Sequence, residues 1–426
     1  MPKPPSFLYC YYIMKQLQDL SWWVQYRDPS DIYKHHPSFL KLEFMTYFCA
    51  LLTLIHALRN GGRFKWLWLG VILHGLVVEA ISYNLPEIDN FWHAQGTIMF
   101  LGGRLPLYIV VIYAVFLYTA SVAVAHWRLK WWAEPFAVGL TVVLIDLPYD
   151  ICAVKHMAWT WHDTDPNIYD RMYWAPWTSY YFHASFACGF TFAFHGFHRL
   201  FGGNTNRFQS KGFFKEVPNT MLAGMLGFPL GTLQFLPNYH ILHDNYNIHT
   251  EVCVAMFFVV YITIVWKGDR AACLERSLSA EKLRKTNWLT EITLLAVVYF
   301  TFFIHLVVTG KPEDQVSIGL HEVIGPCNET VNMTAASGQI LTKRKYLCLD
   351  DYDEDYFDFH CIKGKPPVGK EWYTVCGTPY RNHMEYIVVV GFASLFGLYW
   401  IFSLIGCGGL PRGTASPSKE PKAKQN

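Results

Sequence analysis

Nine long apolar stretches constrain the fold of this 426-residue chain more than any other feature of its sequence. Each has about 20 mostly apolar residues, the length that an α-helix needs to cross the hydrocarbon core of a bilayer. We therefore predict an all-α fold, a polytopic membrane helix bundle of nine transmembrane helices. The predicted spans are approximately 38–58, 64–84, 96–122, 133–154, 178–198, 218–236, 247–266, 288–309 and 385–407.

The low content of charged residues supports this fold class. Of the residues, 16% are charged and 52% are hydrophobic, whereas a soluble domain carries about 25% charged residues. This deficit excludes a soluble globular enzyme and a disordered chain. The formal net charge of +2 also provides no basic surface of the kind that binds nucleic acid.

The spans divide the chain into five parts. The part before the first span is rich in Trp and Tyr, which suit the headgroup region of a bilayer. The parts are an interfacial N-terminal segment (1–37), an eight-helix membrane bundle (38–309), a Cys-containing loop (310–384), a ninth transmembrane helix (385–407) and a Lys-rich tail (408–426).

The distribution of Lys and Arg predicts the orientation. Nine spans place the two termini on opposite sides, so the connections between spans form two sets. The set on the side of the C-terminus carries 19 Lys and Arg in 73 residues, against 14 in 156 for the other set. The positive-inside rule assigns the denser set to the cytoplasm. We therefore expect a luminal or extracellular N-terminus and a cytoplasmic C-terminus.

The loop 310–384 carries two further indications of the luminal side. Asn328 and Asn332 each begin an Asn-x-Thr acceptor sequence for N-glycosylation. Four of the eleven cysteines lie in the same loop, and an even number in an oxidising compartment predicts disulfides. These cysteines are Cys327, Cys348, Cys361 and Cys376, and they allow three pairings.

The end of the chain carries a candidate targeting signal. Lys422 and Lys424 form a Lys-x-Lys-x-x ending. This ending resembles the dilysine signal by which the coat-protein retrieval machinery returns membrane proteins to the endoplasmic reticulum. It predicts residence there, with the plasma membrane as the alternative location. An ordinary Lys-rich tail is the other interpretation of the same residues.

Ionisable side chains inside the predicted spans are the first candidates for chemistry, because charges in hydrocarbon are costly and usually functional or paired. Glu79, Asp146 and Asp150 lie toward the luminal leaflet, and we predict that they are catalytic. Asp146 and Asp150 are four residues apart on one helix face, so their carboxylates repel and one is expected to keep its proton. The alternative is that Arg104 lies between them and ties the third span to the fourth.

Three histidines after the sixth span form a candidate metal site. His240, His243 and His249 lie close together in the sequence, with Asp244 among them. A catalytic zinc site uses three protein ligands and one open position. The alternative is that these histidines form hydrogen bonds with water and backbone. The sequence identifies no particular cofactor.

Residues 146–190 are unusually rich in Trp and Tyr. Such side chains favour a membrane interface and can form the walls of a site for an apolar ligand. The candidates for binding a lipid or isoprenoid substrate are Arg104, Trp159, Trp161, Tyr173, Trp177 and His183.

The order of these residues resembles the carotenoid 1,2-hydratase-like membrane family over residues 64–200. That family has a Glu late in one helix, an Asp-rich helix, a Trp-x-Trp pair and an aromatic–Pro segment that opens the next helix. The matching residues here are Glu79, Asp146, Asp150, Trp159, Trp161, Tyr173 and Pro176. The resemblance implies a helical membrane fold and the location of a site. The whole chain also resembles an uncharacterised family of multi-pass membrane proteins of animals, which implies no activity.

Three functions are compatible with these patterns. The first is an acid/base enzyme that acts on a lipid or isoprenoid at the luminal leaflet, which requires Glu79, Asp146 and Asp150 to line one apolar cavity. The second is a transporter or channel, for which the sixth span would be kinked or broken at Pro229. The third is a non-catalytic scaffold or receptor that binds partners through the loop 310–384.

Overall fold

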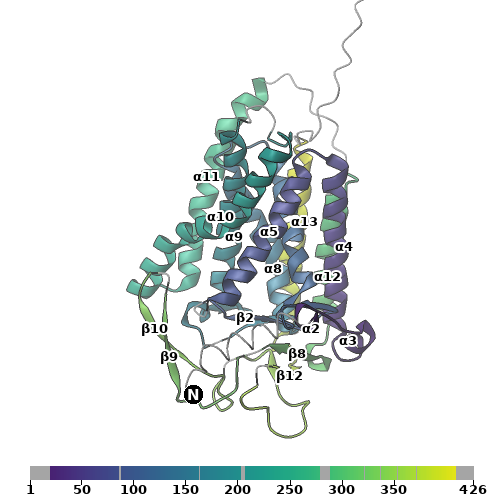
Figure 1. The fold of residues 1–426 in the computed structure, drawn as a ribbon, viewed down its shortest axis with the longest axis vertical. Coiled ribbons are helices and arrows are strands. Elements are labelled where there is room, and N and C mark those ends of the chain that lie inside the picture. The colour runs from purple at the N-terminus through teal and green to yellow at the C-terminus, as the bar shows by residue number, and fades with distance from the viewer. Residues whose placement is uncertain are drawn as a thin grey trace, which may run out of the picture.

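Nine long helical elements stand side by side in the computed structural model of the chain (Figure 1). The structure describes residues 20–408, except 86–87, 163, 203–206, 279–287, 321, 336, 353 and 371. The predicted signal at Lys422 and Lys424 lies outside the described residues. The long helices are α4 (Pro37–Asn60), α5 (Phe64–Asn84), a composite of α6 (Leu107–Tyr113), the π-helix η1 (Ala114–Tyr118) and α7 (Thr119–Ala125), then α8 (Glu134–Lys155), α9 (Trp177–Leu200), α10 (Phe213–Tyr239), α11 (Thr250–Leu278), α12 (Glu291–Thr309) and α13 (His383–Gly406).

Seven of these described elements are long and apolar enough to cross a membrane. Helices α9 and α10, which correspond to the predicted spans 178–198 and 218–236, do not meet that standard. They are long enough, but α9 contains three histidines and α10 begins with a polar turn around Lys215 and Glu216. A multi-pass membrane protein is therefore confirmed, whereas nine spans remain a prediction.

Helix α10 continues through Pro229. The predicted sixth span, kinked or broken at Pro229, is therefore not broken within the described residues, and the kink stays a prediction. Glycines bring α10 close to α9, because a Cβ atom on Gly189 would lie 2.7 Å from the carbonyl oxygen of Gly227. Small residues of this kind allow membrane helices to pack backbone against backbone.

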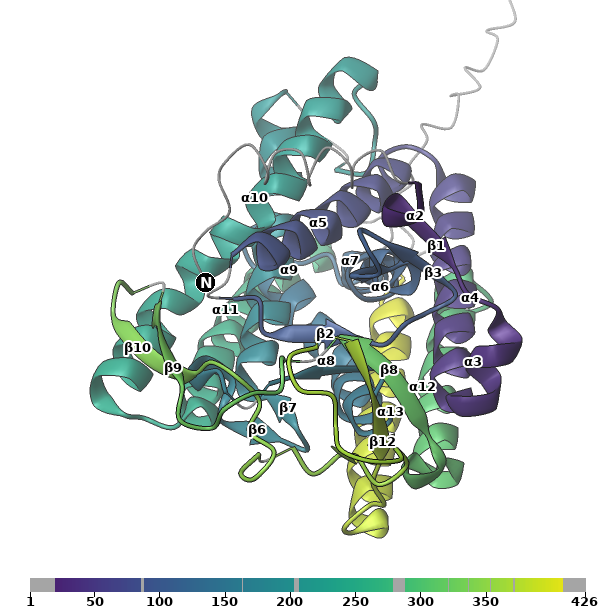
Figure 2. The same cartoon turned by 60° about the horizontal axis from the view of Figure 1, so that its bottom comes forward.

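Short strands gather at one end of the bundle, below the helices in Figure 1 and nearest the viewer in Figure 2. We call this the strand-bearing end. Its presence corrects the all-α prediction, since small sheets accompany the helices. The antiparallel groups are β1 (Val24–Tyr26) with β3 (Ile98–Phe100) and β4 (Leu105–Pro106); β2 (Phe91–His93) with β5 (Trp159–Trp161); β6 (Arg171–Met172) with β7 (Ala175–Pro176); β8 (Val316–Leu320) with β12 (Trp372–Gly377) and β11 (Phe357–Asp358); and β9 (Thr330–Thr334) with β10 (Ile340–Arg344).

Short helical segments complete the same end. The expected interfacial segment before the first span contains two of them, within the residues that are described. They are α2 (Leu20–Trp23), α3 (Pro29–His35), the 3-10 helices η2 (Pro166–Ile168) and η4 (Pro312–Asp314), and the π-helix η3 (His240–Asn245).

The predicted third span begins too early. Residues 98–106 form β3 and β4 instead of a helix, and the helix begins at Leu107. The turn between these strands contains Gly102 and Gly103, whose φ angles are +68° and +85°. These backbone angles suit glycine and interrupt a helix. Arg104 therefore lies before the span and not inside it.

The loop between α12 and α13 packs onto the strand-bearing end. The backbone N–H of Gln95 donates to the carbonyl oxygen of Ile318 at 3.1 Å, which ties the loop to the segment after β2. Two disulfides close the loop, Cys327–Cys348 and Cys361–Cys376. The predicted pair of disulfides is thus confirmed, and one of its three pairings is selected.

Helix α8 lies at the centre of the bundle. It packs against α7, α9, α11, α12 and α13. Most of its side chains are therefore buried, and Asp146 and Asp150 have 0% exposure. The two acidic groups predicted to matter most are on the helix that is most enclosed by its neighbours.

Candidate functional site

A cavity of about 390 Å³ lies between the helices near the strand-bearing end. Aliphatic and aromatic side chains from α5, α6, η1, α9 and α10 form most of its wall, and β2 and β5 contribute Phe91, Trp159 and Trp161. Met333 of the β9–β10 hairpin also lines it. The cavity therefore has the character of a site for an apolar molecule.

A first polar group on the cavity wall is centred on Glu79 of α5. The hydroxyl of Tyr113 donates a hydrogen bond to Oε1 of Glu79 at 2.9 Å. Nε2 of His93 lies 3.8 Å from Oε2 of the same carboxylate. The His93 ring stacks on Trp159, with centroids 5.8 Å apart and planes 10° apart. All four side chains line the cavity.

A second polar group joins α8 to α9. Nε2 of His183 lies 3.4 Å from Oδ1 of Asp146, and the hydroxyl of Ser179 donates to Oδ2 of Asp150 at 2.9 Å. Ser179 and His183 line the cavity, but Asp146 and Asp150 do not. The two carboxylates are therefore a layer behind the wall and reach the cavity through their partners on α9.

The expectation that three carboxylates line one cavity is met by Glu79 alone. Asp146 and Asp150 fail it because side chains of α9 cover them. Arg104 does not lie between the two aspartates. It forms an ion pair with Asp89, and its guanidinium lies 3.6 Å from the centroid of the Trp92 ring.

The predicted aromatic wall divides into two parts. Trp159 and Trp161 line the cavity as expected. Tyr173 instead lines a separate polar pocket of about 400 Å³, where its hydroxyl donates to Oε1 of Glu385 at 2.6 Å. Trp177 begins α9 and packs edge-on against Tyr180. Tyr173 and Trp177 therefore do not contribute to the wall of the central cavity.

Each of the three histidines predicted as metal ligands contacts a carboxylate. Nδ1 of His240 and Nδ1 of His243 lie 2.7 Å and 2.8 Å from the two oxygens of Asp244. Nε2 of His249 lies 3.1 Å from Oδ1 of Asp170. Burial alone would raise the pKa of Asp244, but the two histidine hydrogen bonds outweigh it and lower this pKa to about 2. Among the described residues, these histidines do not form a group able to share one ion.

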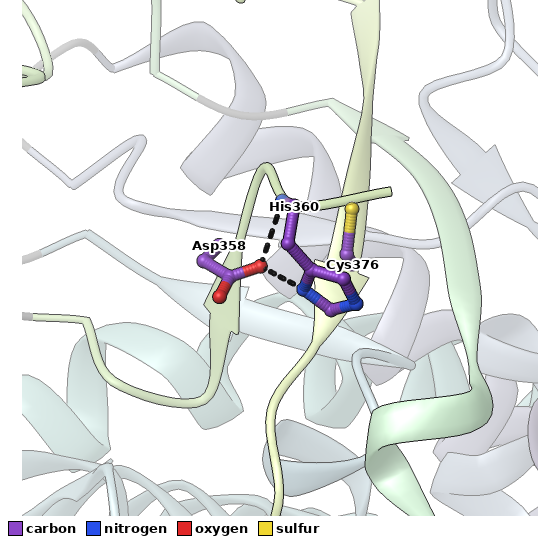
Figure 3. Close-up of side chains that lie close together, drawn as sticks. All are labelled: Asp358, His360 and Cys376. Atoms are coloured by element: carbon purple, nitrogen blue, oxygen red, sulfur yellow. Dashed lines mark hydrogen bonds and ion pairs between the residues drawn. The ribbon is translucent and has the colours of Figure 1, made fainter. Parts of the chain in front are cut away.

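Two groups of His, Cys, Asp and Glu in the described residues are close enough to hold a metal ion. One is Asp358, His360 and Cys376, beside the loop disulfide (Figure 3). The sulfur of Cys376 is bonded to Cys361 and is therefore no thiolate ligand. The other group is Asp146, Asp150 and His183, with one ligand atom of each within 4.8 Å of the others.

Three residues of this site were not predicted. Tyr113, His93 and Ser179 touch the two carboxylate groups. Ser179 stands four residues before His183 in the sequence, so a shared helix face is a signal that could have identified it. His93 reaches Glu79 only because β2 pairs with β5, and no spacing in the sequence indicates that pairing.

Comparison with known proteins identifies a family. Residues 11–405 match the family model described as a domain of unknown function (DUF7802), so the chain belongs to that family. No curated protein and no solved structure matches the chain. The resemblances to the carotenoid hydratase-like family and to an animal family accordingly stay predictions.

Proposed function

We propose that this member of the DUF7802 family is a membrane enzyme that binds a lipid or isoprenoid in the central cavity and acts on it by acid/base chemistry. In this proposal Glu79 acts on the cavity wall, and Asp146 acts through His183 in place of lining the cavity as the sequence predicted. One observation carries the proposal. His183 lines an apolar cavity while its Nε2 atom lies 3.4 Å from the fully buried carboxylate of Asp146.

The cavity supports the substrate class. Its volume of about 390 Å³ falls within the range of small-molecule sites, roughly 300–1,000 Å³. Its wall is dominated by Ile, Leu, Val, Phe and Trp side chains, which favour a hydrocarbon chain over a polar solute. A substrate taken from the bilayer would keep its chain among these side chains and present its reactive end to the polar groups.

The two polar groups support acid/base chemistry. A buried carboxylate beside an imidazole orients the ring and stabilises its protonated form. His183 can therefore donate a proton to a substrate double bond or accept one from a substrate hydroxyl. Glu79, held by Tyr113, supplies a second carboxyl on the same cavity wall and can accept a proton from water.

The proposed orientation places this site toward the lumen. The strand-bearing end carries both disulfides, and Asn328 and Asn332 are exposed there. Disulfides persist in oxidising compartments, and the distribution of Lys and Arg points the same way. We propose residence in the endoplasmic reticulum, with retrieval through Lys422 and Lys424.

Transport is the alternative function. It would require a polar route through both leaflets, whereas Glu79, His93 and His183 on the cavity wall lie toward the strand-bearing end and His74 lies midway along α5. A broken sixth span was one support for the transport prediction, and α10 has no break at Pro229.

Comparative lipidomics tests the enzyme proposal. Cells that lack the protein would be complemented with the wild-type chain, Glu79→Gln or His183→Ala. Asp31→Asn serves as a control, because Asp31 is an exposed acid on α3. We expect the wild-type chain and Asp31→Asn to restore the same lipid species, and the two cavity variants to fail. A lipid composition that is identical in all these cells would exclude the enzyme, and a change in a polar solute alone would favour transport.

A further inference from the structure

We propose that Asp146, Asp150 and His183 bind one divalent transition-metal ion, with zinc as the first candidate. The inference deepens the proposed function, on whose site it rests. It identifies the group that would activate water or polarise a substrate oxygen at the cavity wall.

The first support is the geometry of the three side chains. Two carboxylates one helical turn apart on α8 face an imidazole on α9, and one ligand atom from each lies within 4.8 Å of the others. Bond lengths of about 2.0–2.2 Å place neighbouring donors of a zinc ion roughly 3.4 Å apart. Nε2 of His183 and Oδ1 of Asp146 already have that separation, 3.4 Å.

The second support is the state of the carboxylate oxygens. Neither oxygen of Asp146 accepts a hydrogen bond of good geometry from a described residue, and neither does Oδ1 of Asp150. Their contacts are with each other and with Nε2 of His183, which lies 3.4 Å from Oδ1 of Asp146. Both side chains have 0% exposure. Buried carboxylates without donors are costly unless they are neutralised or coordinate a metal. A divalent cation would neutralise both charges at once, whereas one shared proton would leave one negative charge.

Other clusters in the described residues lack this combination. The carboxylate of Asp244 holds His240 and His243 by hydrogen bonds. The group of Asp358 and His360 depends on Cys376, whose sulfur is in a disulfide. At Asp146 and Asp150, by contrast, three of the four buried carboxylate oxygens accept no hydrogen bond of good geometry from a described residue, which points to a ligand.

The donor set and the surroundings indicate the class of ion. One imidazole and two carboxylates form a mixed nitrogen and oxygen donor set, which suits zinc, manganese or iron. Calcium prefers sites made of oxygen ligands only. Three protein ligands leave a position open, as in catalytic zinc sites. Since His183 and Ser179 line the cavity and cover the two aspartates, the ion would lie one side chain behind the wall, and its open position would reach the cavity between these two side chains. With an ion in place, His183 is a ligand and does not transfer the proton that the proposed function assigns to it, so Glu79 takes over the acid/base role on the cavity wall.

Metal analysis of the purified full-length protein tests the inference. The chain would carry an affinity tag without histidine, and its metal content would be measured by plasma mass spectrometry after dialysis against zinc. We expect about one ion per chain in the wild-type protein, and at least a fivefold loss in Asp146→Asn and Asp150→Asn. Glu79→Gln is the matched control, because it changes a carboxyl on the same cavity wall outside the metal-binding group, and it should keep the ion.

A second measurement uses only the wild-type protein, so its result does not depend on whether a variant folds. Cobalt replacing zinc in the wild-type protein should give visible absorption bands of a low-symmetry site with nitrogen and oxygen ligands. Absence of a stoichiometric ion in the wild-type protein, or equal metal in Asp146→Asn, would overturn the inference. A bound ion with unchanged lipids in the lipidomics experiment would leave the metal site standing and exclude the enzyme. If the lipid composition depends on Glu79 and His183 but the protein contains no ion, the enzyme proposal stands and the metal site is excluded.

Discussion

Tyr113 on α6 donates its hydroxyl to Glu79 on α5 across 2.9 Å, which makes a hydrogen bond between two neighbouring helices at the wall of the central cavity. The contact does two things. It joins the second and third long helical elements, and it fixes one carboxylate oxygen of Glu79 while the other faces His93 at 3.8 Å.

Removal of this hydroxyl should affect stability little and activity more. Interhelical hydrogen bonds in membrane proteins contribute about 0.6 kcal/mol on average, so Tyr113→Phe should lower the free energy of unfolding by about that amount. A double-mutant cycle with Glu79→Gln in detergent would measure the coupling. If the effects of the two substitutions on the free energy of unfolding are additive, the hydrogen bond does not contribute to stability, whatever the effect of each substitution alone.

Close packing of α9 against α10 leads to a second prediction. A methyl group at Gly189 would meet the backbone of Gly227 and Gly231 at 2.7 Å and 2.9 Å. Overpacking of this kind costs about 1–3 kcal/mol, so Gly189→Ala should lower the thermal unfolding midpoint. A methyl group at Gly196 on the same helix would have no atom within 4 Å, so Gly196→Ala is the matched control. An equal effect of both substitutions would contradict this account of the packing.

The apolar runs predicted the fold well where a helix is apolar on most sides. The predicted span 38–58 corresponds to α4, and 385–407 corresponds to α13. The error at the third span has a local cause, since Gly102 and Gly103 adopt positive φ angles in a turn. The Gly102-Gly103 pair with Arg104 after it is itself a turn signal, but the span was assigned from the longer apolar run that contains it.

The candidate site was less predictable because its contacts come from distant parts of the chain. The spacing of Asp146 and Asp150 was enough to place them on one helix face. It could not show that Ser179 and His183 would cover them. Arg104 was a plausible partner for these aspartates by depth alone, but the strands around it direct its side chain to Asp89.

The pair of histidines on Asp244 predicts how stability depends on pH. The pKa of Asp244 is about 2 in the folded protein, against about 3.9 in an unfolded chain. A lowered pKa contributes stability that is fully present above the unfolded value and is lost as the pH falls toward the folded one. Asp244→Asn should therefore be less stable than the wild-type protein above pH 4, and the difference should shrink between pH 4 and pH 2. Unfolding midpoints at each pH would measure it, with Asp31→Asn as the control, and a difference that stays constant over this range would contradict the assignment.

The glycosylation sequences offer a direct test of which side the strand-bearing end faces. Asn328 and Asn332 are both exposed, and oligosaccharide transfer to Asn requires the luminal side and an intact Asn-x-Thr sequence. Treatment with an amidase that removes N-glycans should increase the gel mobility of the wild-type protein. Asn328→Gln and Asn332→Gln should each remove one glycan, and Thr330→Ala and Thr334→Ala should reproduce the two effects, because they destroy the same acceptor sequences. Equal mobility before and after treatment, in a protein correctly inserted in membranes, would instead place this end and its cavity on the cytoplasmic side.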